Sequence, residues 1–190
     1  MTKGMYHHLA EVWKKPSREM LQPLLIQWRD SNSIVKVEKP LRLDRARALG
    51  YKAKTGFVVL RVRLKRGGRQ RPRHKHGRKS RKQHVRKTLK MSYQWVAEIR
   101  AEKKYPNLEV LNSYSLAKDG KYAFFEVIMI DPEKPEIKND PVLKWICKPE
   151  NKNRAQRGLT SAGKKSRGLT SKSHNLKVRP SLRAWDRQGK

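Results

Sequence analysis

Apolar side chains near the start of the chain recur every three or four positions, the spacing of a helix with one buried face. They predict one helix over residues 5–14 and a second that begins after Ser17, a residue suited to cap it. Pro16 separates the two patterns and ends the first. Because Pro23 lies inside the second pattern and lacks a backbone donor, we expect a kink or a late start there. Residues 1–32 are therefore predicted to form an N-terminal helical segment.

The middle of the chain alternates between strand and helix patterns. Short β-branched or alternating apolar runs predict strands, and longer runs with helical spacing predict helices. Asp119-Gly120 is a hairpin signal, and the run that follows it is apolar enough for a central strand. In chain order the predicted elements are a strand at 34–37, a helical turn at 44–49, a strand at 56–65, a helix at 92–105, and strands at 108–116 and 121–130.

The strand at 56–65 predicts both a buried face and a cationic face. Successive side chains of a strand point to opposite sides of the sheet. One side of this strand is aliphatic and should pack inward, while the other becomes cationic toward its end. The inward side carries Val58, Leu60, Val62 and Leu64, and the other carries Phe57, Val59, Arg61, Arg63 and Lys65.

The net charge of the chain indicates which class of partner it binds. The 190 residues include 48 Lys and Arg against 16 Asp and Glu, a formal net charge of +32. Residues 45–97 contain 19 of these cations and no acidic residue. A small domain keeps its surface solvated with a net charge of magnitude about 2–8, so this excess predicts a polyanion close by. The pI of about 10.8 is typical of nucleic-acid-binding proteins.

Two cationic segments lack a clear hydrophobic period. Residues 66–91 contain Gly67-Gly68, Pro72 and Gly77, and such a long run inside a compact domain is either functional or disordered. The C-terminal tail likewise lacks a clear hydrophobic period, and it repeats Arg-Gly-Leu-Thr-Ser at 157–161 and 167–171. We expect residues 66–91 and 151–190 to be disordered without RNA, since they bury too little apolar surface to offset the loss of chain entropy.

Several motifs resemble a known family. The match covers nearly the whole chain, and its longest runs are unusual in sequence. The matching stretches are Met5-Tyr6-His7-His8 through Trp13-Lys14-Lys15-Pro16, Leu49-Gly50-Tyr51-Lys52-Ala53-Lys54 through Arg66-Gly67-Gly68-Arg69, Val110 to Tyr114, Phe125 to Ile128, and Arg157 to Leu169. With these stretches the chain resembles the large-subunit ribosomal protein "fifteen-e" family of archaea and eukaryotes. The short basic insert at 72–90, together with the end soon after Trp185, is similar to the archaeal branch.

The resemblance implies a fold and a function. The fold is α/β (α+β), with a small antiparallel four-stranded sheet in β-(α)-β-α-β-β order, which agrees with the order read from the pattern. We expect this core at 33–131, with a basic excursion at 66–91, and a basic C-terminal extension at 132–190. The implied function is that of a structural constituent of the cytoplasmic large ribosomal subunit. Its partners would be large-subunit rRNA, which it binds and stabilises, and neighbouring ribosomal proteins.

The residues themselves suggest how RNA would be held. Lys and Arg neutralise phosphates and release counterions, and Arg also stacks or forms forked hydrogen bonds. Glycines near the second cationic segment would let backbone amides approach phosphates closely. The predicted RNA-binding residues are Lys52, Lys54, Arg61, Arg63, Arg66, Arg69, Arg71, Arg73, Arg78, Lys79, Arg81, Arg154, Arg157, Lys164, Lys165 and Arg167.

Aromatic side chains could add base stacking. Trp13, Trp28, Trp95, Phe124 and Phe125 lie at core spacing and are expected to pack inside. Tyr51 and Trp185 stand in basic surroundings and are the better stacking candidates.

No catalytic or metal-binding constellation is predicted. Cys147 is the single cysteine, and no organised base is tied to it. His74 and His76 lack the second close ligand pair that zinc requires. We expect no catalytic residue, no metal, no cofactor and no small-molecule substrate. We also expect no membrane segment and no signal peptide, because the longest apolar stretch, within 122–130, is too short to span a bilayer.

Two other classes stay open. A chromatin-type protein would bind duplex DNA and should show a repeated basic period or a recognition helix. An RNA-modifying enzyme would need a cofactor loop or a pocket rich in carboxylates. The ribosomal scaffold needs neither feature.

Overall fold

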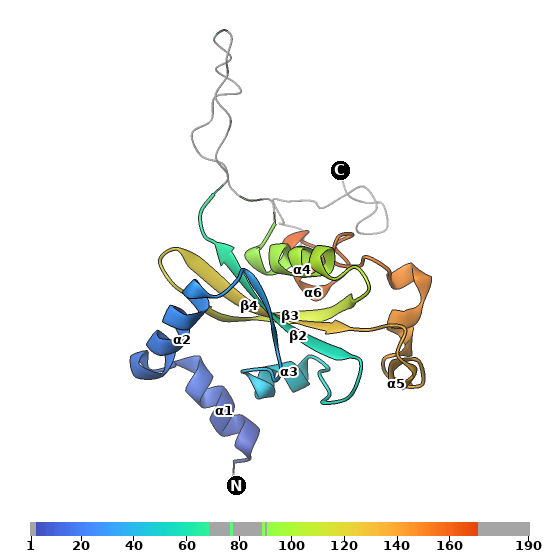
Figure 1. Ribbon diagram of the computed structural model, residues 1–190, viewed down its shortest axis with the longest axis horizontal. Helices are drawn as coiled ribbons and strands as arrows, with labels where there is room; N and C mark the ends of the chain where they lie inside the picture. Colours follow the sequence, from blue (N-terminus) through green and yellow to red (C-terminus); the bar gives the residue numbers. More distant parts are fainter. Residues whose placement is uncertain (1–2, 69–76, 78–88, 90, 171–190) are drawn as a thin grey trace.

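A computed structural model gives the fold of residues 3–68, 77, 89 and 91–170. A four-stranded antiparallel sheet with strand order β1-β2-β4-β3 forms its centre. Helices cover both faces of this sheet (Figure 1). The α+β class and the predicted chain order are confirmed. In order, the central elements are β1 (Ile34–Val37), α3 (Leu43–Ala48), β2 (Phe57–Lys65), α4 (Tyr93–Lys104), β3 (Glu109–Lys118) and β4 (Tyr122–Ile130).

The N-terminal segment forms the two expected helices, α1 (Met5–Lys14) and α2 (Arg18–Asp30). Ser17 caps α2 by accepting a hydrogen bond from the Met20 amide at 3.2 Å. Pro23 lies inside α2, which nevertheless begins at Arg18, so the proline does not delay the helix.

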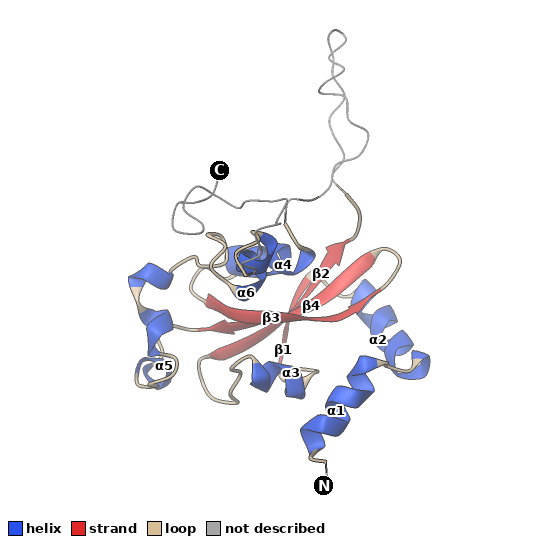
Figure 2. Cartoon of the chain, turned by 180° about the vertical axis from the view of Figure 1, so that it is seen from behind, coloured by secondary structure: helices blue, strands red, loops and turns tan. Residues whose placement is uncertain are grey.

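Helices α4 and α6 lie on one face of the sheet, and α2 and α3 lie on the other (Figure 2). The small side chains of Ala97 and Ala101 let α4 pack closely against the aliphatic face of β2, and both are fully buried. On the opposite face, Trp28 of α2 packs on Phe124 of β4, with ring centroids 5.3 Å apart.

The face of β2 that becomes cationic toward its end is partly covered, and Lys65 at that end is exposed. Val59 is buried, and the Arg61 guanidinium carbon lies 5.2 Å from the centre of the Trp28 ring. The sequence showed alternation along β2, but it did not show that α2 would fold back over the cationic side.

The hairpin between β3 and β4 forms where Asp119-Gly120 predicted it. Gly120 does not adopt a positive φ. Instead the Asp119 carboxylate accepts hydrogen bonds from the amides of Lys121 at 2.7 Å and Tyr122 at 2.5 Å. The aspartate side chain therefore closes this turn, as in an Asx turn.

Residues 132–170 are folded, in contrast to the extension that we predicted from residue 132. Residues 131–150, which we name the lobe, pack around an apolar cluster of Ile130, Ile137, Leu143 and Ile146. Residues 152–170, which we name the strap, return across α4 and β3. The elements are α5 (Pro135–Lys138), η2 (Lys144–Cys147), η3 (Pro149–Asn151) and α6 (Ser161–Ser166).

None of the helices in the described part of the chain is long and apolar enough to cross a membrane.

Candidate nucleic-acid interface

The structure describes some of the predicted RNA-binding residues but not all of them. Six of them lie in the basic insert, outside the described residues, and stay predictions: Arg69, Arg71, Arg73, Arg78, Lys79 and Arg81. Trp185, one of the two predicted stacking residues, also lies outside the described residues. Tyr51, the other, packs edge-on against Phe57 with ring centroids 5.6 Å apart, so it contributes to the core.

Lys52 and Lys54 turn toward a carboxylate of the lobe. Their ammonium groups lie 2.9 and 2.6 Å from Asp140 Oδ2, and Lys54 also donates to the Glu136 carbonyl at 2.9 Å. These hydrogen bonds, the one from Lys54 first, lower the pKa of Asp140 well below its usual range. The two lysines thus tie the loop after α3 to the lobe, and part of their charge is compensated within the protein.

Arg61 and Arg63 lie against aromatic rings rather than pointing freely outward. The pKa of Arg61 is lowered because its guanidinium is partly buried, and Glu126 opposes the shift. Arg63 lies 4.8 Å from the centre of the Tyr122 ring and donates to the Arg29 carbonyl at the end of α2. Arg63 is therefore a C-terminal cap of α2, where a cation also favours the helix dipole.

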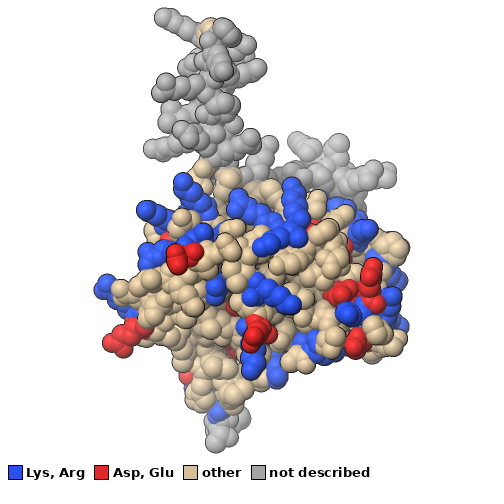
Figure 3. All heavy atoms as spheres, in the orientation of Figure 1, with Lys and Arg blue, Asp and Glu red and all other residues tan. Residues whose placement is uncertain are grey.

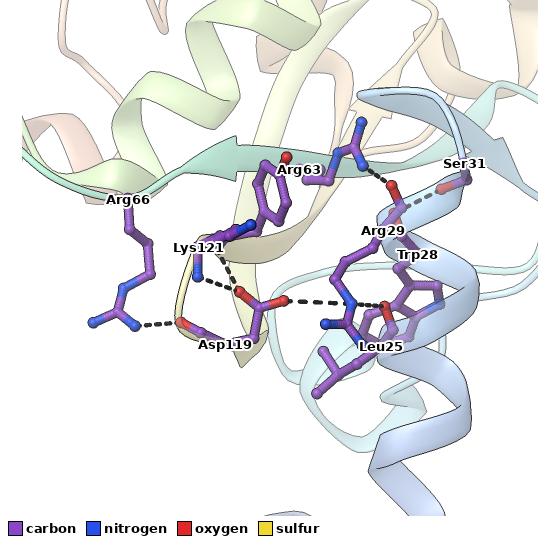
Figure 4. Close-up of polar contacts among 9 residues, drawn as sticks. Leu25, Trp28, Arg29, Ser31, Arg63, Arg66, Asp119 and Lys121 are labelled. Atoms are coloured by element: carbon purple, nitrogen blue, oxygen red, sulfur yellow. Dashed lines mark hydrogen bonds and ion pairs between the residues drawn. The ribbon is translucent and has the colours of Figure 1, made fainter.

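Cations gather around the β3–β4 hairpin (Figure 4). Arg66 donates to the Asp119 carbonyl oxygen. Arg29 donates to the Leu25 carbonyl at 3.2 Å, and its Nε lies 3.9 Å from the Asp119 carboxylate. Lys121 belongs to the same turn and is exposed.

Backbone carbonyls, rather than carboxylates, hold most of these guanidinium groups. A carbonyl accepts a hydrogen bond but carries no net charge, so it fixes a side chain without neutralising it. Arginine has several N–H donors in a rigid fork, and those that remain can contact a phosphate. Arg63, Arg66, Arg157 and Arg167 are anchored in this way. Such a surface is pre-organised for an anion.

Arg154 instead holds the strap against β3. It is half-buried and donates to the carbonyls of Val110 at 2.6 Å and Leu111 at 2.9 Å. Burial lowers its pKa, while Glu98, Glu109 and Glu102 oppose that shift. The assignment of Arg154 to RNA is not supported by this position.

Three buried glutamates accept hydrogen bonds from the strap. Glu102 accepts hydrogen bonds from the amides of Ala155 and Gln156, and Glu109 accepts one from the amide of Asn153. Glu98 accepts hydrogen bonds from the hydroxyls of Thr160, at 2.5 Å, and Ser113. Burial raises the pKa of Glu98, although these two hydroxyls and Arg154 oppose the rise. Burial likewise raises the pKa of Glu109.

The Arg-Gly-Leu repeat forms the same turn in both copies, and in the second copy this turn ends α6. In the first copy the Leu159 amide bonds to the Arg154 carbonyl and the Gly158 amide to the Ala155 carbonyl. The second copy repeats this pattern, with Leu169 bonded to Lys164 and Gly168 to Lys165. This pair of hydrogen bonds, with glycine at positive φ, is the Schellman motif.

Gly158 and Gly163 permit close packing rather than an approach to phosphate. A Cβ on Gly163 would lie 2.7 Å from the Gly158 Cα, and a Cβ on Gly158 would lie 2.9 Å from the Trp95 ring. Our prediction that these glycines bring amides to phosphates is therefore replaced by a packing role. The closeness of α6 to α4 depends on them.

A chain of contacts joins the two cationic segments at one edge of the molecule. The Tyr93 hydroxyl bonds to both the amide and the carbonyl of Gly67, at 2.8 and 3.0 Å, and so links the two ends of the insert. Next to it, the Ser92 amide donates to the Ser166 hydroxyl of α6 at 3.0 Å. We name the exposed cations along this edge the cationic rim: Lys65, Arg66, Lys118, Lys121, Lys164 and Lys165.

The cationic rim borders the points where the insert leaves and re-enters the fold. Blue Lys and Arg atoms gather along the upper edge of the molecule in Figure 3. Our sequence analysis missed Lys118 and Lys121, since both lie in the near-neutral part of the chain. Only the hairpin contact with Arg66 brings them to the rim.

Catalytic or metal chemistry finds no support in the described part of the chain. No group there brings together enough His, Cys, Asp or Glu side chains to hold a metal ion. Cys147 is partly buried, and burial raises the pKa of its thiol, which disfavours the thiolate.

Comparison with known proteins gives one family. The family model described as "Ribosomal L15" matches residues 4–185. The large ribosomal subunit protein eL15 of the archaeon Methanocella arvoryzae is 47% identical over 196 aligned residues, which cover 100% of both chains.

Proposed function

Since the chain belongs to the ribosomal L15e family, we propose that it is a structural constituent of the large ribosomal subunit in the cytoplasm. In this role it binds folded large-subunit rRNA and stabilises it. The cationic rim and the basic insert form the contact, and the four-stranded sheet is the rigid support that positions them.

Electrostatics explain the binding. An isolated chain of net charge +32 repels itself, and RNA phosphates within a Debye length of about 8–10 Å remove that cost. Each phosphate that is neutralised also releases condensed counterions. Sequence-independent contacts of this kind suit a protein that holds a folded RNA in place rather than reading its bases.

One observation carries the proposal: carbonyl-anchored arginines and exposed lysines from distant parts of the chain meet at one edge. Arg66 directly follows β2, Lys121 belongs to the hairpin and Lys165 to α6. Their convergence is a property of the fold, because the three positions are far apart in the sequence.

The lobe is the part that we propose faces neighbouring ribosomal proteins. Residues 131–150 carry four lysines and five acidic residues, in contrast to residues 45–97, which carry 19 cations and no acidic residue. Val142 at its surface is 65% exposed. A near-neutral surface with an exposed aliphatic side chain suits a protein neighbour better than a phosphate backbone.

Sedimentation tests this function directly. We expect the chain to remain with large subunits after a wash at high salt, because many simultaneous contacts must be broken to release it. Recovery with chromosomal DNA would instead support a chromatin protein. Recovery in the free fraction would support an enzyme that visits the particle, and either result would contradict the scaffold.

A further inference from the structure

We propose that the surface formed by α1 and α3 is a second RNA-binding surface, at which Tyr6 and Arg47 form a stacking platform for a base. This inference rests on the proposed function, but it concerns the face of the sheet opposite to α4 and α6 (Figures 1 and 2). The RNA bound there is therefore a separate segment from the one at the cationic rim.

The first argument is that α1 is incompletely packed. None of its ten residues is buried. Met5 and Val12, which lie on one side of the helix, are 60% and 50% exposed. Isolated helices shorter than about 12–15 residues are marginal in water. A helix of this kind gains stability from a partner that covers it.

Two arginine–aromatic contacts attach α1 to α3. Arg42 lies 5.4 Å from the centre of the Trp13 ring, and Arg47 lies 5.5 Å from the centre of the Tyr6 ring. Arg47 also donates to the Tyr6 hydroxyl. That contact uses one donor of the guanidinium, so the remaining donors can bind a ligand.

Charge identifies the partner as a polyanion. The cations on α1, α3 and their ends are Lys3, Lys14, Lys15, Arg42, Arg45 and Arg47. The acidic residues of this surface are Glu11 and Asp44, and Asp44 is paired with Arg42 at 3.6 Å. A protein partner would need a strongly acidic surface to match this excess, whereas an RNA strand supplies both phosphates and stacking bases.

Aromatic exposure identifies the mode of contact. Tyr6 is 39% exposed, and its ring is already in contact with a cation. Bases stack on aromatic rings and on guanidinium planes in single-stranded or looped RNA. The combination of Tyr6, Arg47 and the exposed Arg45 therefore fits an unpaired base with its flanking phosphates.

Photo-crosslinking from position 6 tests where this surface lies. Full-length chains carrying benzoylphenylalanine at position 6 or at position 121 would be assembled into large subunits. We expect both positions to crosslink to rRNA, and to nucleotides in separate segments. A crosslink from position 6 to a protein, to nothing, or to the same nucleotides as position 121 would overturn the inference. Failure at position 121 would count against the cationic rim instead.

Charge removal provides a quantitative test with a matched control. Changing Arg45 and Arg47 to Gln should flatten the log–log salt dependence of affinity for large-subunit rRNA by about 1.5 units. Arg45→Gln alone, which leaves the Tyr6 contact intact, should give about half that change. Changing Lys134 and Lys138 of the lobe to Gln removes the same charge and should leave the slope unaltered. Equal slopes for the arginine and lysine variants would overturn the proposal.

Tyr6 itself is tested by two replacements. Tyr6→Phe loses the hydroxyl but keeps the ring and its contact with the Arg47 guanidinium, so it should retain most of the affinity, whereas Tyr6→Leu should weaken binding by about tenfold. Thermal melting of the free variants checks that α1 stays in place. Loss of affinity in both replacements, or in neither, would contradict a stacking role.

Discussion

Val62→Asp is expected to unfold the four-stranded sheet. Val62 is fully buried, and its neighbours across the sheet are Ile34 on β1 and Phe125 on β4. The residues that pack around it in this cluster are apolar, so none of them can pair with a new carboxylate. Burying an unpaired charge costs several kcal/mol, on the order of the stability of a whole domain, which is about 5–15 kcal/mol. Circular dichroism and thermal melting would measure the loss.

Arg63→Gln is the matched control, one residue along the same strand. It removes the contact with the Tyr122 ring and the hydrogen bond to the Arg29 carbonyl. The expected loss of stability is about 1 kcal/mol, because the site is partly exposed. A melting transition for Val62→Asp like that of Arg63→Gln would show that the assignment of the two faces is wrong.

Arg154→Met should detach the strap from the sheet. The substitution keeps an unbranched apolar stem but removes the guanidinium, and so leaves the carbonyls of Val110 and Leu111 without their donor. It also removes the positive charge next to Glu98, Glu102 and Glu109. Removing one partner of a buried charged group costs about 3 kcal/mol or more, and partial exposure places the expected value near the lower end.

Amide exchange across the strap would show this effect, with urea unfolding as the measure of stability. Arg157→Met is the control, because Arg157 is exposed and bonds to the carbonyls of Lys152 and Glu150. The control should lose less than about 1 kcal/mol. If Arg154→Met kept normal protection in residues 152–170, the buried network would not be what holds the strap.

The sequence predicted the core well, because local signals agreed with the final packing. Ser17 caps the helix that it was expected to precede, and Ser92, the first residue of the helix predicted at 92–105, caps α4. Short apolar runs became strands close to their predicted bounds, since each run was bordered by charged or turn residues. Asp119 marked the hairpin correctly, although through its side chain rather than through a glycine conformation.

The strap could not be predicted, because its attachment is non-local and polar. The charge of Glu98, Glu102 and Glu109 gives no sequence signal of burial, yet they are buried and accept hydrogen bonds from residues 153–160. A cationic, glycine-containing tail is the usual signature of disorder. Here Gly168 forms the turn that ends α6, and Gly158 and Gly163 allow close packing. These roles depend on neighbours that only the folded structure brings together.

The sequence predicted what kind of partner the interface binds, but not which residues form it. The excess of Lys and Arg indicated a polyanion, and it could not say which cations were already engaged. Lys52, Lys54 and Arg154 are held by partners within the protein. Lys118 and Lys121 come from a near-neutral stretch and reach the rim only through the hairpin. Which cations belong to the interface therefore depends on how the fold brings them together.

The salt dependence of rRNA affinity tests the central claim most directly, in two variants that each lose four lysines. One variant changes Lys118, Lys121, Lys164 and Lys165 of the cationic rim to Gln, and the other changes Lys134, Lys138, Lys144 and Lys148 of the lobe. The predicted result is a log–log slope flattened by about 3 units in the rim variant, at about 0.7–0.9 per phosphate contact, and an unchanged slope in the lobe variant. Equal slopes in the two variants would contradict the cationic rim as the surface that binds rRNA.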